Sequence, residues 1–263
     1  MTVFGALDGW RQRPIPDQTE LRGRRVGCRA LPIDRTGAHF AETLVEIRAL
    51  GIAGENYYCS TRNPPYWQRI DGSIPELWLR RSVAAMLAAV NETLAVADLE
   101  LFVFDAWRPR AVQSYFHDVW MPRQLKMSRP ELAGEALTRE IERYWAAPSR
   151  GEDSPAPHAT GAAVDLSIRW QGGDLLWMGS LFDDVTGIAH RDHFETIASG
   201  MGFSDAEARA NRRLLHWAME AQGFAGHAEE WWHFSWGDQM WAAATGQPAA
   251  RYGLAKPKGA HDE

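Results

Sequence analysis

The sequence is poor in cysteine, and this limits the metal sites that it can form. Only Cys28 and Cys59 occur among its 263 residues, and they form no CxxC pattern. A structural zinc site held by thiolates is therefore excluded by count, while a disulfide between the two is allowed but not required.

Long hydrophobic runs are also absent. No window approaches the roughly 18 apolar residues that a membrane span needs. The first residues, MTVFGALDGWRQRPIPD, lack the basic and apolar regions of a secretory signal. We therefore expect a cytoplasmic protein with no membrane partner, or a periplasmic one if a leader precedes these residues.

Positive charge is not in excess, since the formal net charge is −6 and the pI is near 5.9. This balance argues against nucleic acid or an anionic membrane as a partner. The cluster of Arg22, Arg24 and Arg25 is too short to change that, and we expect it in a solvated loop or at a strand edge. The GxGxxG and GxSxG patterns of nucleotide-binding proteins and serine hydrolases are missing as well.

Tryptophan is unusually frequent, with 13 residues, in a chain that is otherwise ordinary for a soluble globular protein. Its large rigid rings are suited to the walls of cores and pockets. The length fits one large domain or two small ones. We expect an N-terminal arm over residues 1–40, a single domain over 41–245 and a C-terminal tail over 246–263.

Hydrophobic periodicity predicts strands and helices that do not alternate in regular β-α-β units. This favours an α+β fold with a mixed or antiparallel central sheet flanked by helices and an extended N-terminal arm. Strands are expected at 99–107, 162–170 and 231–237. Helices are expected at 36–50, 74–96, 110–120 and 204–223, the last with Ser204 as its N-cap and Glu207 completing a capping box.

The stretch HATGAAVD places His158 seven residues before Asp165. Asp165 lies between Val164 and Leu166 in a predicted strand, so its carboxylate faces the surface opposite to theirs and needs a strong partner such as a cation. Taken alone, the stretch fits equally well a turn histidine and a strand aspartate that make ordinary hydrogen bonds.

The stretch EWWH holds Glu230 and His233 three residues apart. In a regular strand the two side chains would point to opposite faces, but they can converge if Glu230 lies in the turn before the strand. His233 would then bind a metal, and Glu230 would take a proton from the metal-activated water. Trp231 and Trp232 would pack beside the site and exclude bulk water. Taken alone, a surface glutamate and a core-edge histidine explain the stretch better.

The stretch DAWRPR follows the strand predicted at 99–107. Arg108 would be aimed into a pocket from the strand end, because Pro109 stops the strand. There it could stabilise an oxyanion, with Asp105 orienting the arginine or a metal ligand. An Arg108–Asp105 surface pair of little consequence is the alternative.

Taken together, these motifs resemble the zinc D-alanyl-D-alanine dipeptidases of the VanX type. HATGAAVD fits the pattern SxHxxGxAxD from its histidine onward, EWWH fits ExWH and DAWRP fits DxxRP, all in the order of that family. MGSLFDD at 178–184 also falls where a related segment of the family lies. The resemblance covers about residues 45–240.

The resemblance implies a zinc-dependent dipeptidase that hydrolyses D-alanyl-D-alanine or a similar small dipeptide. It also assigns a residue to each role in the reaction. One zinc ion would be held by His158, Asp165 and His233, with Glu230 as the base and Arg108 at the oxyanion. Asp183 would hold the free ammonium of the substrate, although Asp184 is its immediate neighbour. Ala156 replaces the family serine, which leaves the contact to the substrate carboxylate open.

Two other functions remain in view. One is a carboxypeptidase that acts on peptidoglycan stem peptides, and the other is a non-catalytic relative that only binds a metal or ligand. The intact Glu230 argues against the second, because a binding site needs no base. His190 and His193 lack the HExxH order, and we expect them on a helix surface or behind the metal ligands. A homodimer is left open.

Overall fold

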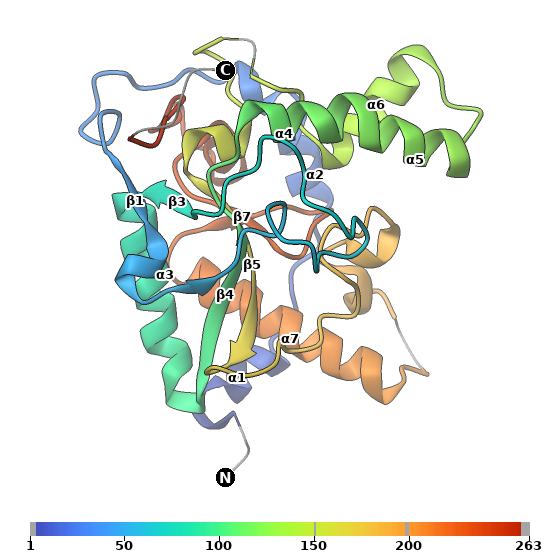
Figure 1. Ribbon diagram of the computed structural model, residues 1–263. Helices are drawn as coiled ribbons and strands as arrows, with labels where there is room; N and C mark the ends of the chain where they lie inside the picture. Colours follow the sequence, from blue (N-terminus) through green and yellow to red (C-terminus); the bar gives the residue numbers. More distant parts are fainter. Residues whose placement is uncertain (1–3, 150, 198–199, 259–263) are drawn as a thin grey trace.

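The computed structural model describes residues 4–149, 151–197 and 200–258. Figure 1 shows them arranged around a central sheet, with long helices packed against it. The sheet has five strands in the order β2-β4-β5-β7-β6. Its strands are β2 (Ala53–Gly54), β4 (Leu99–Asp105), β5 (Ala163–Trp170), β6 (Ala225–Gly226) and β7 (His233–Ser235).

The sheet mixes both strand orientations. β2 runs parallel to β4, whereas the pairs β4–β5, β5–β7 and β6–β7 are antiparallel. A second, two-stranded sheet pairs β1 (Leu44–Glu46) with β3 (Trp78–Arg80). The predicted α+β class with a mixed sheet flanked by helices is confirmed.

Helices are spread along the whole described chain. The α-helices are α1 (Asp8–Gln12), α2 (Thr19–Arg25), α3 (Arg81–Leu94), α4 (Arg110–Tyr115), α5 (Met121–Ser128), α6 (Gly134–Tyr144), α7 (Phe203–Glu220) and α8 (Gln239–Thr245). Shorter helical turns are η1 (Gly5–Leu7), η2 (Cys28–Ala30), η3 (Ile47–Leu50), η4 (Ala95–Ala97), η5 (Phe116–Trp120), η6 (Pro157–Thr160), η7 (Gly187–Ala189) and η8 (His193–Glu195). None of the described helices combines the length and apolarity that a bilayer span requires.

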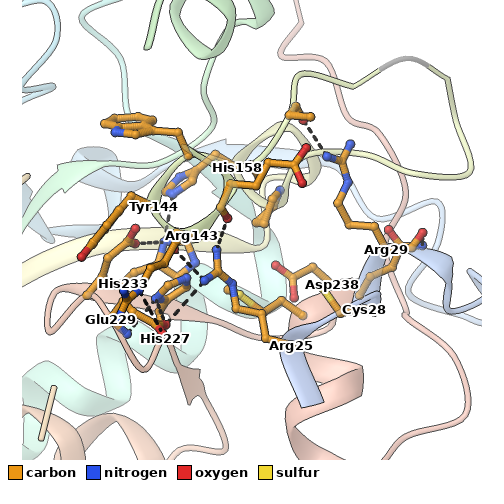
Figure 2. Close-up of a pocket in the computed structure, with 18 of the residues that line it drawn as sticks. Arg25, Cys28, Arg29, Arg143, Tyr144, His158, His227, Glu229, His233 and Asp238 are labelled. Atoms are coloured by element: carbon orange, nitrogen blue, oxygen red, sulfur yellow. Dashed lines mark hydrogen bonds and ion pairs between the residues drawn. The ribbon is translucent and has the colours of Figure 1, made fainter. Parts of the chain in front are cut away.

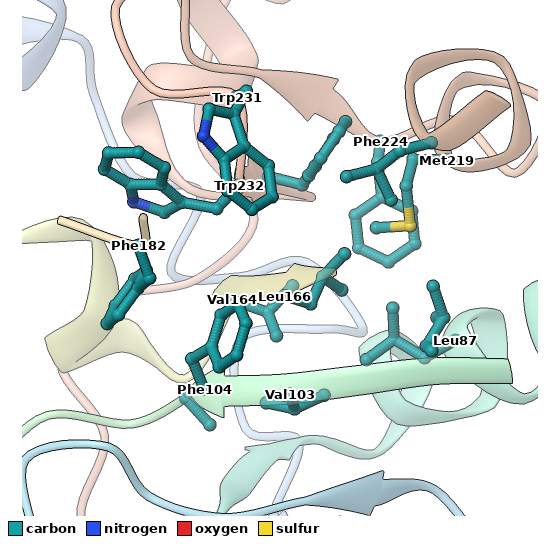
Figure 3. Packing of buried hydrophobic residues seen from close by; sticks show 14 of the residues in the cluster. Leu87, Val103, Phe104, Val164, Leu166, Phe182, Met219, Phe224, Trp231 and Trp232 are labelled. Carbon is teal, nitrogen blue, oxygen red and sulfur yellow. The ribbon is translucent and has the colours of Figure 1, made fainter. Parts of the chain in front are cut away.

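The main core lies between the sheet and the two long helices α3 and α7 (Figure 1). Leu87 from α3 and Met219 from α7 gather with Val103 and Leu166 from the two long strands (Figure 3). Leu87, Val103, Leu166 and Met219 are inaccessible to solvent. Burial of each such side chain stabilises the fold by about 1.5–3 kcal/mol, so the two central strands are held firmly in place.

Two expected helices are wrong in part, and the errors are linked. Residues 44–46, expected inside the helix 36–50, form strand β1, and only the short turn η3 follows before Gly51. Residues 78–80, expected inside the helix 74–96, form β3, so that helix begins at Arg81. β1 and β3 pair with each other, and this tertiary pairing overrides the helical spacing of both segments.

The other expected elements are present with shifted ends. Strands β4 and β5 and helix α4 lie where the sequence predicts them. Helix α7 begins at Phe203 with Gly202 as its N-cap, so the expected Ser204 cap and capping box are not formed. Helix α8 was not expected. Cys28 and Cys59 are both free thiols.

The N-terminal residues pack on the domain and contain two short helices. Arg11 of α1 pairs with Glu207 of α7 at 3.0 Å, and Trp217 Nε1 donates to the Arg13 carbonyl at 2.9 Å. Helix α2 lies against α8, where Arg24 Nη1 donates to the Ala244 carbonyl at 2.9 Å. These contacts bring α1 beside α7 and α2 beside α8.

Candidate active site

Three side chains that are distant in the sequence meet in the structure. His158, Asp165 and His233 are buried, and their ligand atoms all lie within 4.8 Å of one another. His158 Nε2 is 3.3 Å from Asp165 Oδ2, and His233 Nδ1 is 2.9 Å from Asp165 Oδ1. Two imidazole nitrogens and one carboxylate suit a divalent cation, zinc above all, and leave a coordination position open.

The register of the sheet brings two of these residues together. Asp165 in β5 and His233 in β7 are direct partners across the antiparallel pair. Their side chains therefore stand at adjoining positions on one face of the sheet. Val164 and Leu166, on either side of Asp165, belong to the apolar core on the opposite face.

His158 reaches the same point from the turn that precedes β5. It lies in η6, which ends at Gly161 with a φ of 68°. A side chain at Gly161 would collide with Leu44, and the positive φ would strain any residue other than glycine. This glycine turn lets the chain enter β5 directly after His158.

Hydrogen bonding and burial define the states of the two imidazoles. His158 Nδ1 lies 2.7 Å from the Ala106 carbonyl oxygen, which can only accept, so Nδ1 carries the proton and the Nε2 lone pair faces Asp165. Burial lowers the pKa of His233 to about 4, so its ring is neutral at pH 7.

Glu230 lies beside this cluster. Residues 231 and 232 form a turn before β7. Glu230 therefore lies outside the strand, and its side chain is not forced to the face opposite to that of His233. Its Oε2 is 3.7 Å from His233 Nδ1. Burial, and then the charge of Asp165, raises the pKa of Glu230 well above its usual value. A buried carboxyl group of this kind beside a metal ligand set can exchange protons with a reacting group.

Arg108 is the fixed cation of the site. Its Nε donates to Asp105 Oδ2 at 2.8 Å, its Nη1 to Gln113 Oε1 at 2.9 Å and its Nη2 to Asp165 Oδ2 at 3.1 Å. The guanidinium also lies 5.0 Å from the centre of the Tyr58 ring. These contacts hold the planar group in one orientation at the edge of the metal ligand cluster.

Asp105 connects Arg108 to His158. It is fully buried, and its Oδ2 lies 3.3 Å from His158 Nδ1 as well as 2.8 Å from Arg108 Nε. Burial raises the pKa of Asp105, whereas Arg108 and His158 lower it. The carboxylate therefore restrains both side chains from behind the site.

The two adjacent aspartates, Asp183 and Asp184, have different surroundings in the structure. Asp183 is buried, and its Oδ2 accepts hydrogen bonds from the hydroxyls of Tyr58 and Tyr66, each at 2.9 Å. Burial, then the charge of Asp165, raises the pKa of Asp183 to about 8. Asp184 instead accepts from the backbone and hydroxyl of Thr186, in a local turn.

A cavity of about 500 Å³ joins these groups. Part of its lining is drawn in Figure 2, where His158 and His233 lie close together. Its wall includes the cluster of His158, Asp165 and His233 and also Arg108, Asp183, Glu230 and Trp232. Trp231 does not line it: the ring is buried in the apolar core, and its Nε1 donates to Ser180 Oγ at 2.9 Å (Figure 3). Only one of the two tryptophans is therefore a wall of the cavity.

The expected solvated loop for the arginine cluster is wrong. Arg22, Arg24 and Arg25 lie in helix α2, and Arg22 and Arg25 line the cavity. Among the three, Arg24 alone keeps an exposed partner, Glu20. The tertiary placement of α2 was not visible in its local charge pattern.

Several residues of the site carried no motif. Tyr58 and Tyr66 lie in an irregular segment between β2 and β3, and Gln113 lies on helix α4. Buried Arg191 donates to the carbonyl oxygens of His227 at 3.0 Å and His233 at 2.9 Å, and so holds the turn around Glu230. An isolated arginine or tyrosine gives no sequence signal of this kind.

His190 and His193 lie away from the ligand cluster. His190 Nε2 is 3.3 Å from Arg143 Nη2, and burial lowers the pKa of His190 to about 4. His193 lies in η8. Within the described residues, neither belongs to the group of ligands around Asp165.

Comparison with known proteins identifies the family. The family model described as D-ala-D-ala dipeptidase matches residues 74–249. The chain belongs to this family. Every residue with a role in the three motifs, from Asp105 to His233, falls within the matched range, and the expected class of hydrolase is confirmed.

Individual relatives agree with the family match. The D-alanyl-D-alanine dipeptidase of Synechocystis sp. is 34% identical over 229 residues, which cover 81% of this chain and 87% of the relative. The D-alanyl-D-alanine dipeptidases of Enterococcus faecium and Enterococcus faecalis are 30% and 28% identical and cover 58% and 59% of this chain, and 69% and 70% of their own length.

Proposed function

We propose that this member of the family is a zinc-dependent dipeptidase that hydrolyses D-alanyl-D-alanine or a similar small dipeptide. The observation that carries the proposal is the position of Glu230 beside the cluster of His158, Asp165 and His233, in one cavity with Arg108 and Asp183. The family match supports the substrate class.

His158, Asp165 and His233 would hold the zinc ion. Their fit rests on three observations: close ligand atoms, a His158 lone pair aimed at Asp165 and a neutral His233 ring. A bound zinc ion supplies a Lewis acid that polarises the scissile carbonyl and makes a water molecule acidic enough to attack at neutral pH.

Glu230 is the proton carrier in the proposed reaction. It takes a proton from the attacking water as the C–O bond forms, and it gives this proton to the leaving amine as the C–N bond breaks. The turn before β7 gives its carboxylate the necessary position next to His233. One group serves both steps, so no second acid is needed.

Arg108 would donate hydrogen bonds to the negatively charged oxygen that develops on the scissile carbonyl. Its guanidinium is held by Asp105 and Gln113, so little reorganisation is needed when negative charge appears on the carbonyl oxygen. Preorganised donors of this kind stabilise a transition state most effectively in a buried site.

Asp183 would bind the free ammonium group of the dipeptide. Its carboxyl lies in a buried pocket with two tyrosine hydroxyls, where a charged amine can pair with it. A longer peptide carries a neutral amide at this place, so Asp183 gains no charged partner and the longer peptide binds more weakly than a dipeptide. This favours a dipeptidase over a carboxypeptidase on peptidoglycan stems.

The deciding experiment compares the parent enzyme with Glu230→Gln. The parent should contain one zinc ion per chain and release D-alanine from D-alanyl-D-alanine faster than from a stem pentapeptide. Glu230→Gln should keep the zinc and lose turnover by a factor of ~10² or more, as expected for a proton-transfer group. Glu220→Gln, at the exposed end of α7, is the matched control. Turnover that survives in Glu230→Gln would remove the proposed base.

A further inference from the structure

Part of the active-site cavity is built by the N-terminal segment 22–29. This segment covers the end of α2 and the turn η2, and it precedes the range 74–249 that matches the family. The residues that line the cavity from it are Arg22, Arg25, Val26, Gly27, Cys28 and Arg29. Figure 2 places Arg25, Cys28 and Arg29 along one side of the pocket, facing the loop that carries His158.

Two arginines of this segment meet Glu229, the residue next to Glu230. Arg22 Nε lies 3.5 Å from Glu229 Oε1, and Arg25 Nη1 lies 3.5 Å from Glu229 Oε2. Arg143 adds a third guanidinium at 3.7 Å. Glu229 is only 5% exposed, so its carboxylate depends on these cations.

The same arginines are anchored on other elements. Arg25 donates to the carbonyl oxygens of Glu142 at 2.8 Å and Arg143 at 2.6 Å, at the end of α6. Arg22 makes two hydrogen bonds with Asp192, at 3.1 and 2.8 Å. Glu229 is therefore held by arginines that are themselves anchored to Asp192 and to the end of α6.

A general base must be held within a fraction of an ångström of its productive position. We propose that Arg22 and Arg25 are positioning residues of the catalytic reaction. By binding Glu229 they fix the turn that carries Glu230, and the N-terminal segment is thereby a working part of the active site. This inference rests on the proposed function, in which Glu230 is the base.

The test compares Arg22→Ala and Arg25→Ala with Arg24→Ala. Arg24 lies between them in α2, but it contacts exposed Glu20 and the Ala244 carbonyl instead of Glu229. For each variant, kcat and KM for D-alanyl-D-alanine and zinc per chain are measured. We expect kcat to fall ~10-fold or more in the first two variants, since small displacements of catalytic groups are costly. KM and zinc content should stay close to the parent values, and Arg24→Ala should match the parent.

Two further variants keep the outcome decisive. Arg25→Lys retains the charge without the planar fork and should recover part of the lost kcat. Glu229→Gln preserves the side-chain volume and should lower kcat even if an alanine variant fails to fold. Equal kcat in Arg25→Ala and Arg24→Ala, or parent kcat in Glu229→Gln, would overturn the inference. So would a loss confined to zinc content or KM.

If Glu230 is not the catalytic base, the variants give a different pattern of rates. In that case Glu230→Gln keeps the parent rate, whatever the arginine variants do. If Glu230→Gln is inactive while Arg22→Ala and Arg25→Ala equal the parent, the base stands and only the role of the N-terminal segment is rejected.

Discussion

Asp105 and Asp165 face each other across strands β4 and β5, and the guanidinium of Arg108 binds both carboxylates. Two buried acids at directly opposed positions would repel each other without a cation between them. The arginine therefore has two tasks in the site: it holds the carboxylate of Asp165, and it presents a positive charge to the cavity.

Arg108→Lys should be far from conservative. A lysine has one ammonium group and cannot bind Asp105, Gln113 and Asp165 at three separate nitrogens, as Arg108 does. We expect kcat to fall ~10²–10³-fold, the range seen when an oxyanion donor is removed. Steady-state kinetics with D-alanyl-D-alanine measures this, and a kcat within a few-fold of the parent would contradict the oxyanion role.

Zinc should stabilise the folded protein through the three ligands. A ligand that binds only the folded state adds about 2.7 kcal/mol of stability at a concentration 100 times its Kd. A chelator should therefore lower the Tm, and added zinc should restore it. The metal-free His158→Ala variant should show almost no response to zinc, while magnesium should leave the parent unchanged. A zinc-dependent Tm in His158→Ala equal to that of the parent would place the metal elsewhere.

Asp183→Asn should weaken the binding of the dipeptide substrate. Loss of the carboxylate removes a charged partner of the substrate ammonium, and a charge-assisted hydrogen bond contributes about 1.5–3 kcal/mol. KM should therefore rise ~10- to 100-fold, while Asp184→Asn should bind the dipeptide like the parent because Asp184 bonds only its own turn. Equal effects of the two variants would reject Asp183 as the ammonium site.

In the metal-free protein, the effect of Asp183→Asn on the Tm should depend on pH. The pKa of Asp183 is raised by burial to about 8 from the ordinary value of 3.8. Between these values the folded state keeps a proton that the unfolded state has released, so stability from this group is lost as the pH rises. The Tm difference, Asp183→Asn minus parent, should grow from pH 4 to pH 8 and then level off. A difference independent of pH would show that Asp183 titrates normally.

Gly226→Ala should disturb the active site from behind. An added Cβ at Gly226 would run into the guanidinium of Arg191, which is buried and binds the carbonyls of His227 and His233. Overpacking of this kind costs about 1–3 kcal/mol of stability. We expect a lower Tm together with a lower kcat. Gly9→Ala, on the exposed side of α1 with open space around it, should change neither.

The arrangement of the candidate site residues was more predictable than the fold around them. Apolar alternation around Asp165 and a glycine at position 161 are local features, so they placed β5 and the turn that carries His158. The position of Glu230 before β7 followed from one geometric argument about strand faces. Such inferences need only the residues next to each motif.

The rest depended on contacts between segments far apart in the chain. Residues 44–46 and 78–80 have helical spacing, yet they form a strand pair with each other, and Glu46 then caps the turn η3 with its own side chain. Tertiary packing alone brings Arg25 to the cavity and the hydroxyls of Tyr58 and Tyr66 to Asp183. Local periodicity does not reveal partners that are distant in the sequence, so these residues could not be predicted.

The direct pairing of Asp165 with His233 ties metal affinity to strand alignment. A slip of β7 by one residue would offer the benzyl group of Phe234 to the ion and turn the imidazole toward the opposite face. Single-residue insertions or deletions in either strand should therefore abolish catalysis even when every ligand is retained. Coordinated zinc would in turn lock the two strands in their correct alignment.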